Sequence, residues 1–285
     1  MEVLGGIRML RDLRRRPGAA RARAAFPSVP LVWAGVAASS LLLLGCGEAS
    51  RATEPDLRLE GEITAAKADA LERQLRRAEQ PVRLTVRSAG GDPAAAARLG
   101  RALRARNATL VVDDYCLAGC AQFVFAGAPA REVRPGALVG FHNDLVAGAI
   151  LLRMRGESPP AALDAAAGHD LGVYEAWGIR EPALLDQFTG LDPVCVEWRE
   201  SARAPRFRAN AQIWIPPRAW VDQALGGRTS GWWPSGQAEV DEAGRRVTAD
   251  LPALNGFRYG AARPFQEVAR SLIGRACPAG GPAHV

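Results

Sequence analysis

Several patterns that indicate a particular chemistry are missing from this chain. Its 285 residues contain no C-x-x-C or H-x-x-x-H spacing, so a closed zinc site is not expected. There is no G-x-x-x-x-G-K-[ST] loop, which excludes a P-loop ATPase. The sequence has no internal repeat and no low-complexity run, and Lys67 is its only lysine. We therefore expect neither a metal nor a cofactor.

Excess positive charge is confined to the N-terminus. Residues 1–46 contain seven arginines and two acidic residues, and the rest of the chain holds 29 basic and 28 acidic residues. The formal net charge of +6 therefore belongs mostly to this first segment. Because the remaining body is nearly neutral, it gives no reason to expect phosphate contacts, and we predict no nucleic-acid partner.

The first 46 residues have the order of a secretory leader. An arginine-rich segment precedes an apolar run of 14 residues at 31–44, which is shorter than the ~20 residues of a membrane-spanning helix. The run ends in "LLGC" at 43–46, which resembles the lipobox of bacterial lipoproteins. That resemblance implies cleavage before Cys46, lipidation of this cysteine and a periplasmic protein anchored in a membrane. Gly47 is compatible with the outer membrane, and an uncleaved N-terminal anchor is the alternative.

Export would place the other four cysteines in an oxidising compartment. Cys116, Cys120, Cys195 and Cys277 are an even number, which suggests two disulfides. The simplest of the three possible connectivities joins Cys116 to Cys120 and Cys195 to Cys277.

Strand and helix patterns alternate between residues 57 and 143. Strand-like alternation of apolar and polar residues occurs at 57–63, 82–87, 109–114 and 137–143, and helical patterns at 64–80, 93–107 and 121–127. This order predicts an α/β fold with mainly parallel strands and right-handed crossovers. Residues 144–190 have mostly helical patterns. Residues 191–285 are rich in Trp, Gly and Pro, and we expect short strands and loops there before a final helix at 264–276.

Two turns lie where predicted strands end and helices begin, the place where chemistry gathers in such folds. They read "SAGGD" at 88–92 and "CLAGC" at 116–120, and they lie between "LEGEI" at 59–63 and "PGALVGFH" at 135–142. The order of these motifs resembles the ClpP/crotonase superfamily, and in particular exported ClpP-like periplasmic proteins related to serine peptidases. The resemblance covers about residues 57–143 and implies a spiral ββα core.

These observations divide the chain into four expected parts. A lipoprotein signal peptide (1–46) and a tether (47–56) precede a ClpP-like α/β domain (57–190). A mixed helical and irregular C-terminal extension follows (191–285).

The resemblance also implies roles for residues at the turns. The serine nucleophile of the family aligns with Ala118, whose methyl group cannot attack a carbonyl. The general base aligns with His142. The acidic residue that orients the base falls near Asp192, although the local sequence there does not match, and Asp186 or Asp170 could substitute.

The oxyanion hole of the family is built from N–H groups of the glycine turn and of the residue after the nucleophile. Those positions match Gly90 or Gly91, and Gly119. The resemblance therefore implies a site that keeps its base and its hole but lacks its nucleophile.

Such a site predicts binding without cleavage. We expect an envelope lipoprotein that binds an extended peptide or another envelope protein, or acts as a scaffold. The alternative is an active hydrolase in which water or the thiol of Cys116 or Cys120 is activated by His142. A third reading is a structural envelope protein in which the fold is reused. Family members often oligomerise through helical faces, which implies a homo-oligomer of a stoichiometry that the sequence does not define.

The tryptophans of the C-terminal region allow two interpretations. Trp214, Trp220, Trp232 and Trp233 could form a platform for a peptide or glycan, or a small hydrophobic core stiffened by prolines. Of these two, the sequence favours the core.

Overall fold

The computed structural model describes residues 56–79, 81–197, 205–254, 256–275 and 277. The expected signal peptide with Cys46, and the expected tether up to residue 55, lie outside these residues. Within the described part of the chain, no helix is both long enough and apolar enough to cross a membrane.

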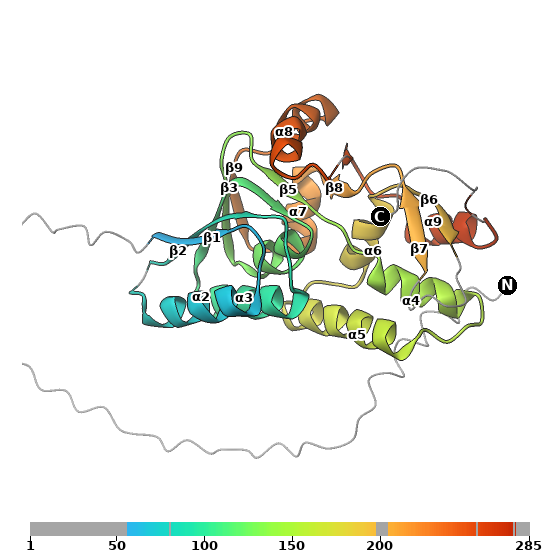
Figure 1. The fold of residues 1–285 in the computed structure, drawn as a ribbon, viewed down its shortest axis with the longest axis horizontal. Helices are drawn as coiled ribbons and strands as arrows, with labels where there is room; N and C mark the ends of the chain where they lie inside the picture. The colour runs from blue at the N-terminus through green and yellow to red at the C-terminus, as the bar shows by residue number, and fades with distance from the viewer. Residues whose placement is uncertain (1–55, 80, 198–204, 255, 276, 278–285) are drawn as a thin grey trace, which may run out of the picture. The chain divides into compact units, whose positions relative to one another are not determined.

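A parallel sheet forms the centre of the fold (Figure 1). Its strands follow the order β1–β2–β3–β4–β9, and β5 pairs with the last part of β3. All of these pairings are parallel. The bounds are β1 (Asp56–Glu60), β2 (Arg83–Ser88), β3 (Thr109–Leu117), β4 (Ala130–Val133), β5 (Leu138–Gly140) and β9 (Arg228–Gly231). The predicted α/β class with a parallel sheet is therefore confirmed.

Helices α2 (Ala65–Arg77) and α3 (Pro93–Ala105) pack side by side, and α3 also packs on the π-helix η1 (Cys120–Phe125). The Thr64 hydroxyl accepts a hydrogen bond from the N–H of Lys67 (3.3 Å) and so caps α2. Helix α3 crosses η1 at Gly100. A Cβ atom there would lie 2.2 Å from the carbonyl oxygen of Phe123, so only glycine permits this close approach.

Residues 144–190 are helical, as the sequence predicts. They form α4 (Leu145–Met154), α5 (Ala161–Ala176) and α6 (Pro182–Thr189). A second hydrophobic cluster lies where α4 and α6 meet β6 (Pro193–Glu197), β7 (Arg206–Ala209) and α9 (Phe265–Leu272). The helix expected at 264–276 corresponds to α9.

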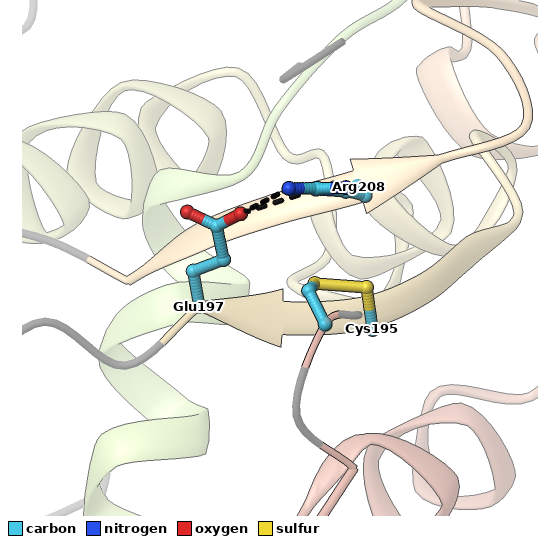
Figure 2. The surroundings of a disulfide bond; sticks show 4 residues. Cys195, Glu197 and Arg208 are labelled. Carbon is cyan, nitrogen blue, oxygen red and sulfur yellow. Dashed lines mark hydrogen bonds and ion pairs between the residues drawn. A yellow bond between two sulfur atoms is a disulfide. The ribbon is translucent and has the colours of Figure 1, made fainter. Parts of the chain in front are cut away.

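A disulfide fastens this second cluster. Cys195 on β6 is bonded to Cys277, with their Cα atoms 5.1 Å apart (Figure 2). On the paired strand β7, the Arg208 guanidinium donates two hydrogen bonds to one carboxylate oxygen of Glu197, from Nη2 (2.7 Å) and from Nε (3.1 Å). The disulfide ties β6 to Cys277, and the ion pair joins β6 to β7.

The segment after residue 190, expected as an extension, is part of the same compact unit as the sheet. Strand β9 pairs with β4, and β8 (Ile213–Ile215) lies beside the end of β5 through a bridge between Phe141 and Trp214. Strand β10 (Phe257–Tyr259) pairs with β8. Two helices of this segment were not predicted from the sequence, α7 (Arg218–Leu225) and α8 (Gln237–Asp250).

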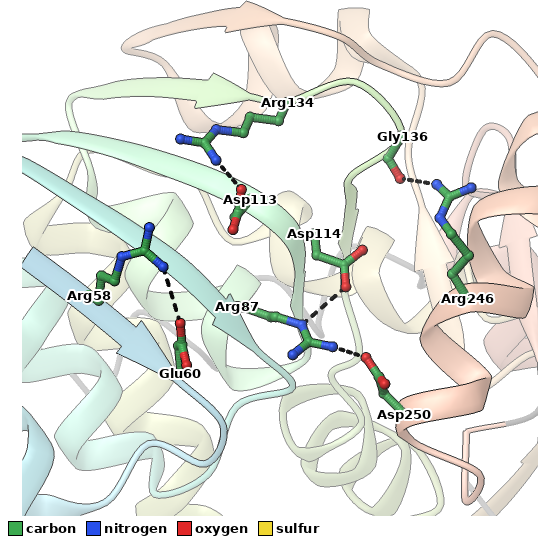
Figure 3. A network of polar contacts seen from close by, with 9 residues as sticks. All are labelled: Arg58, Glu60, Arg87, Asp113, Asp114, Arg134, Gly136, Arg246 and Asp250. Carbon is green, nitrogen blue, oxygen red and sulfur yellow. Dashed lines mark hydrogen bonds and ion pairs between the residues drawn. The ribbon is translucent and has the colours of Figure 1, made fainter. Parts of the chain in front are cut away.

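Polar contacts attach α8 to the sheet (Figure 3). The guanidinium of Arg87, at the end of β2, donates to the carboxylate of Asp114 (3.1 Å) and pairs with Asp250 at the end of α8. Arg246 of α8 donates to the carbonyl oxygen of Gly136 (2.9 Å). Arg87 thereby links α8 to the strand that leads directly into the glycine turn.

The tryptophans lie in or against the core. Trp214 is fully buried, and its ring meets that of Trp220 edge-on, with 4.8 Å between the ring centroids. Trp232 and Trp233 are half-buried and pack on the main hydrophobic cluster. This packing matches the core interpretation.

Candidate functional site

The glycine turn is forced into its shape by contacts that exclude side chains. Gly90 and Gly91 have φ angles of +98° and +149°. A Cβ atom on Gly90 would lie 2.8 Å from the backbone nitrogen of Gly119, and one on Gly91 would lie 2.4 Å from the carbonyl oxygen of Ile63. Both positions therefore need glycine, and the turn lies directly against the elbow at Gly119.

Two side chains hold this turn in place. The hydroxyl of Ser88 accepts a hydrogen bond from the N–H of Gly90 (3.1 Å). The carboxylate of Asp92 accepts one from the N–H of Ala95 (3.0 Å) and caps α3. Asp92 is thus the cap of this helix, and Ser88 fixes the conformation of the turn itself.

The elbow places Ala118 between β3 and η1 in a left-handed conformation. Its φ angle is +46°, which is uncommon for a residue with a Cβ atom. Its N–H donates to the carbonyl oxygen of Gly140 (2.9 Å), and its own carbonyl accepts from the N–H of Gln122 (2.8 Å). Ala118 is half-exposed, so the side chain at this sharp strand-to-helix turn is accessible.

Replacing Ala118 by glycine is expected to raise the free energy of unfolding by about 0.5–1 kcal/mol. The left-handed conformation costs a non-glycine residue about 1–2 kcal/mol, and the larger backbone entropy of glycine in the unfolded chain offsets part of that gain. Chemical denaturation measures the difference. Asn107→Gly is the control, because Asn107 has a similar φ of +48° but asparagine tolerates it better, so its gain is smaller. A loss of stability in Ala118→Gly would show that the backbone at residue 118 is not strained.

The glycine turn and the elbow touch next to Ala118. The Cβ position of Gly119 lies 3.7 Å from the backbone nitrogen of Gly91, so the two peptide groups are in contact. Neither N–H donates a hydrogen bond to another residue of the described ranges. Free N–H donors from two neighbouring turns are the arrangement that binds a carbonyl oxygen or an oxyanion.

His142 follows β5, the strand that pairs with the end of β3. Its Nδ1 lies 2.9 Å from the carbonyl oxygen of Gln212, so Nδ1 carries the hydrogen and donates it. In the neutral ring this leaves a lone pair on Nε2, the form required of a general base. Because Leu117 pairs with Gly140, Ala118 and His142 lie at the ends of adjacent strands.

The three acidic candidates all have other partners. The carboxylate of Asp192 contacts Arg263 (2.9 Å) and accepts from the side-chain amide of Asn210 (2.6 Å). That of Asp186 accepts from the indole N–H of Trp220 (2.8 Å), and burial raises its pKa. Asp170 is buried beside Asn143, and burial likewise raises its pKa.

The His142 ring is thus oriented by a backbone carbonyl where the resemblance implied a carboxylate. Asp192 was the sequence candidate for this position, but its charge is already balanced by Arg263. Sequence reasoning missed Gln212, because every residue has a carbonyl and no residue type identifies this one.

The cysteines flanking Ala118 are bonded to each other. The Cα atoms of Cys116 and Cys120 are 5.2 Å apart, and both residues are fully buried. The expected pairing, together with Cys195–Cys277, is confirmed. A sulfur in a disulfide is not a thiolate nucleophile, so in this state neither cysteine can act as one.

Comparisons with known proteins give a distant likeness. The sheet and helices define an α/β protein with a parallel sheet. No protein-family model and no curated protein matches the sequence. Among solved structures, the chain is similar to ClpP1 from Listeria monocytogenes. That alignment has 16% identity and a TM-score of 0.27, and it covers 30% of this chain and 54%, about half, of ClpP1.

Two further solved structures are similar over a longer stretch. One is a mutant of the same Listeria ClpP1, with 13% identity and a TM-score of 0.38, covering 62% of this chain and 91% of the other. The second is a mutant of 1510-N, a membrane-bound stomatin-specific protease. It has 14% identity and a TM-score of 0.39, covering 73% of this chain and 96% of the other.

Proposed function

We propose that this protein binds extended peptides in a ClpP-like site without cleaving them. The observation that carries the proposal is Ala118. It occupies the strained elbow beside two free N–H donors, where a hydrolase would present a nucleophile, and it offers only a methyl group. A hole and a base without a nucleophile can hold a carbonyl group but cannot form an acyl-enzyme.

The geometry supports a peptide carbonyl as the group that is bound. The N–H groups of Gly91 and Gly119 are fixed by backbone packing, so they need no reorganisation when an oxygen arrives. His142 adds a polar group at the neighbouring strand end, with Nε2 able to accept a hydrogen bond from a ligand N–H. A peptide supplies both groups, because its carbonyl oxygen accepts hydrogen bonds and its N–H donates them.

We further propose that the protein works in the bacterial envelope, anchored through a lipidated Cys46. The arginine-rich segment, the short apolar run and the "LLGC" sequence support this location. The two disulfides support it independently, because such bonds persist mainly in oxidising compartments.

Binding can be tested with a matched pair of variants of the full-length protein. We expect fluorescein-labelled unstructured peptides to bind and to be recovered intact. Ala118→Asp should weaken binding at least tenfold, about 1.4 kcal/mol, because its charge would repel a carbonyl oxygen at the hole. Ala118→Asn has nearly the same size without the charge, and both residue types tolerate a positive φ. Fluorescence anisotropy gives the affinities, and mass spectrometry shows whether the peptides are cut.

Equal affinities for the Ala118→Asp variant and the natural chain would place the peptide elsewhere and overturn the proposed site. Cleavage of the peptides by the natural chain would overturn the non-hydrolytic assignment.

A further inference from the structure

Three buried side-chain oxygens between residues 143 and 189 have no hydrogen-bond partner among the described residues. They are Oδ1 of Asn143, Oε1 of Gln187 and Oγ1 of Thr189. All three residues are at most 2% exposed. Buried polar atoms in folded proteins are satisfied by protein groups or by enclosed water, so this group of atoms indicates a missing hydrogen-bond donor.

The orientation of the Asn143 and Gln187 side-chain amides is fixed by the hydrogen bonds that their NH₂ groups donate. The Nδ2 group of Asn143 donates to the carboxylate of Asp170 (3.2 Å), and an ionised carboxylate can only accept. The Tyr174 hydroxyl donates to the carbonyl oxygen of Gln122 (2.9 Å) and therefore accepts from Nε2 of Gln187 (2.9 Å). Rotating either amide by 180° would break these bonds, so Oδ1 and Oε1 are acceptors in need of a donor.

Both amides are held by one face of helix α5. Asp170 and Tyr174 are four residues apart on this helix, so their side chains lie one above the other. Gln187 and Thr189 come from the end of α6, and Asn143 precedes α4. The unpaired oxygens thus belong to a polar interior where α4, α5 and α6 meet, and ordered water is the donor that fits such an interior.

Asn143 also holds the backbone next to His142. It follows His142 directly, and its side chain is hydrogen-bonded to Asp170 on α5. The His142 ring is hydrogen-bonded to the carbonyl oxygen of Gln212, the residue before β8. The peptide between residues 142 and 143 is therefore held from both ends. Loosening one end would let the ring leave its Gln212 carbonyl.

We propose that Asn143 is a positioning residue for His142, and that water enclosed between α4, α5 and α6 donates hydrogen bonds to Asn143 Oδ1 and Gln187 Oε1. The importance of this positioning for function rests on the role proposed for His142. The positioning itself does not, because it concerns only which nitrogen of the His142 ring carries the hydrogen.

The test is a spectroscopic measurement on the full-length protein. Nitrogen-15 chemical shifts of the His142 ring distinguish hydrogen on Nδ1 from hydrogen on Nε2. We expect the Nδ1–H form alone in the natural chain, and a mixture of both neutral forms in Asn143→Ala. Gln187→Leu is the matched control, because it removes a second of the three unpaired oxygens but is not adjacent to His142 in the chain, so the Nδ1–H form should persist. An unchanged ring in a folded Asn143→Ala would overturn the positioning role.

Two additional measurements keep the outcomes separate. A crystal structure of the natural chain should show water within hydrogen-bond distance of Asn143 Oδ1, and a protein donor there would overturn the water site even if Asn143→Ala failed to fold. In an Ala118→Ser background, Asn143→Ala should slow labelling by a fluorophosphonate about tenfold. No labelling of Ala118→Ser itself would count against the proposed function while leaving the ring measurement valid.

Discussion

Replacing Ala118 by serine is expected to make the protein react covalently with a fluorophosphonate probe, whereas the natural chain stays unlabelled. The elbow already has the left-handed conformation, and the N–H groups of Gly91 and Gly119 lie beside it. His142, with hydrogen on Nδ1, has the lone pair that would take the serine proton. Removing this base in an Ala118→Ser/His142→Ala double variant should slow labelling by about 10²–10⁴-fold.

The comparison needs the natural chain in both redox states. The oxidised natural protein should show no labelling and no hydrolysis, because Cys116 and Cys120 are joined in a disulfide. The reduced protein should also stay inert, because both cysteines are fully buried. Peptide hydrolysis by the natural chain that disappears in His142→Ala would show that another nucleophile operates, and the non-hydrolytic assignment would be wrong. An unreactive Ala118→Ser variant would show that the hole or the base is misplaced.

Loss of the Cys195–Cys277 disulfide should have the largest effect on stability. The bond closes a loop across a sequence separation of 82 residues, and the chain-entropy model gives about 4–5 kcal/mol for a loop of this length. A Cys195→Ala/Cys277→Ala double variant should therefore unfold at markedly lower denaturant concentration. The second hydrophobic cluster, which contains β6 and α9, should loosen first.

The other disulfide provides the matched control. Cys116 and Cys120 are only four residues apart, so the same model gives about 2 kcal/mol for Cys116→Ala/Cys120→Ala. Denaturant unfolding of both double variants measures the difference directly. Equal losses would contradict the loop-length argument and would indicate that local packing determines both effects.

The first part of the fold could be predicted because its elements have clear periodic patterns. Strands β1, β2, β3 and β5 and helices α2 and α3 carry regular alternation or helical spacing, with Thr64 and Pro93 marking helix starts. Strand β4 was missed. Its four residues include Arg131, which is 1% exposed and is held by the carbonyl oxygens of Ala128 (3.0 Å) and Ala126 (3.4 Å). Burial lowers the pKa of Arg131 to about 10, and a buried arginine hides the apolar pattern of a strand.

Helix α8 was missed for a similar reason. Its buried side chains form a narrow stripe of Val240, Ala243 and Val247 among charged residues, and segments rich in glycine and tryptophan surround it. Its position depends on tertiary contacts such as Arg87–Asp250, which no local pattern predicts.

The candidate site was predictable only where chemistry depends on residue type. The two glycine positions, the elbow and the histidine follow from motifs, and the structure brings the two turns into contact. The partner of the His142 ring is a backbone carbonyl and could not be read from side chains. Asn143 and Gln187 belong to no motif of the sequence. Only their burial in the folded protein distinguishes them from other asparagine and glutamine residues.

Strand β9 gives the sheet a high contact order. Ala130 pairs with Arg228, so β4 acquires its outer neighbour from a segment made much later in the chain. Long-range parallel pairing of this kind is slow to form, since loop closure must precede it. A chain ending before residue 228 would leave β4 as an unprotected edge strand, whose free N–H and C=O groups can pair with another molecule. The last quarter of the sequence therefore completes the sheet and makes β9, in place of β4, its edge strand.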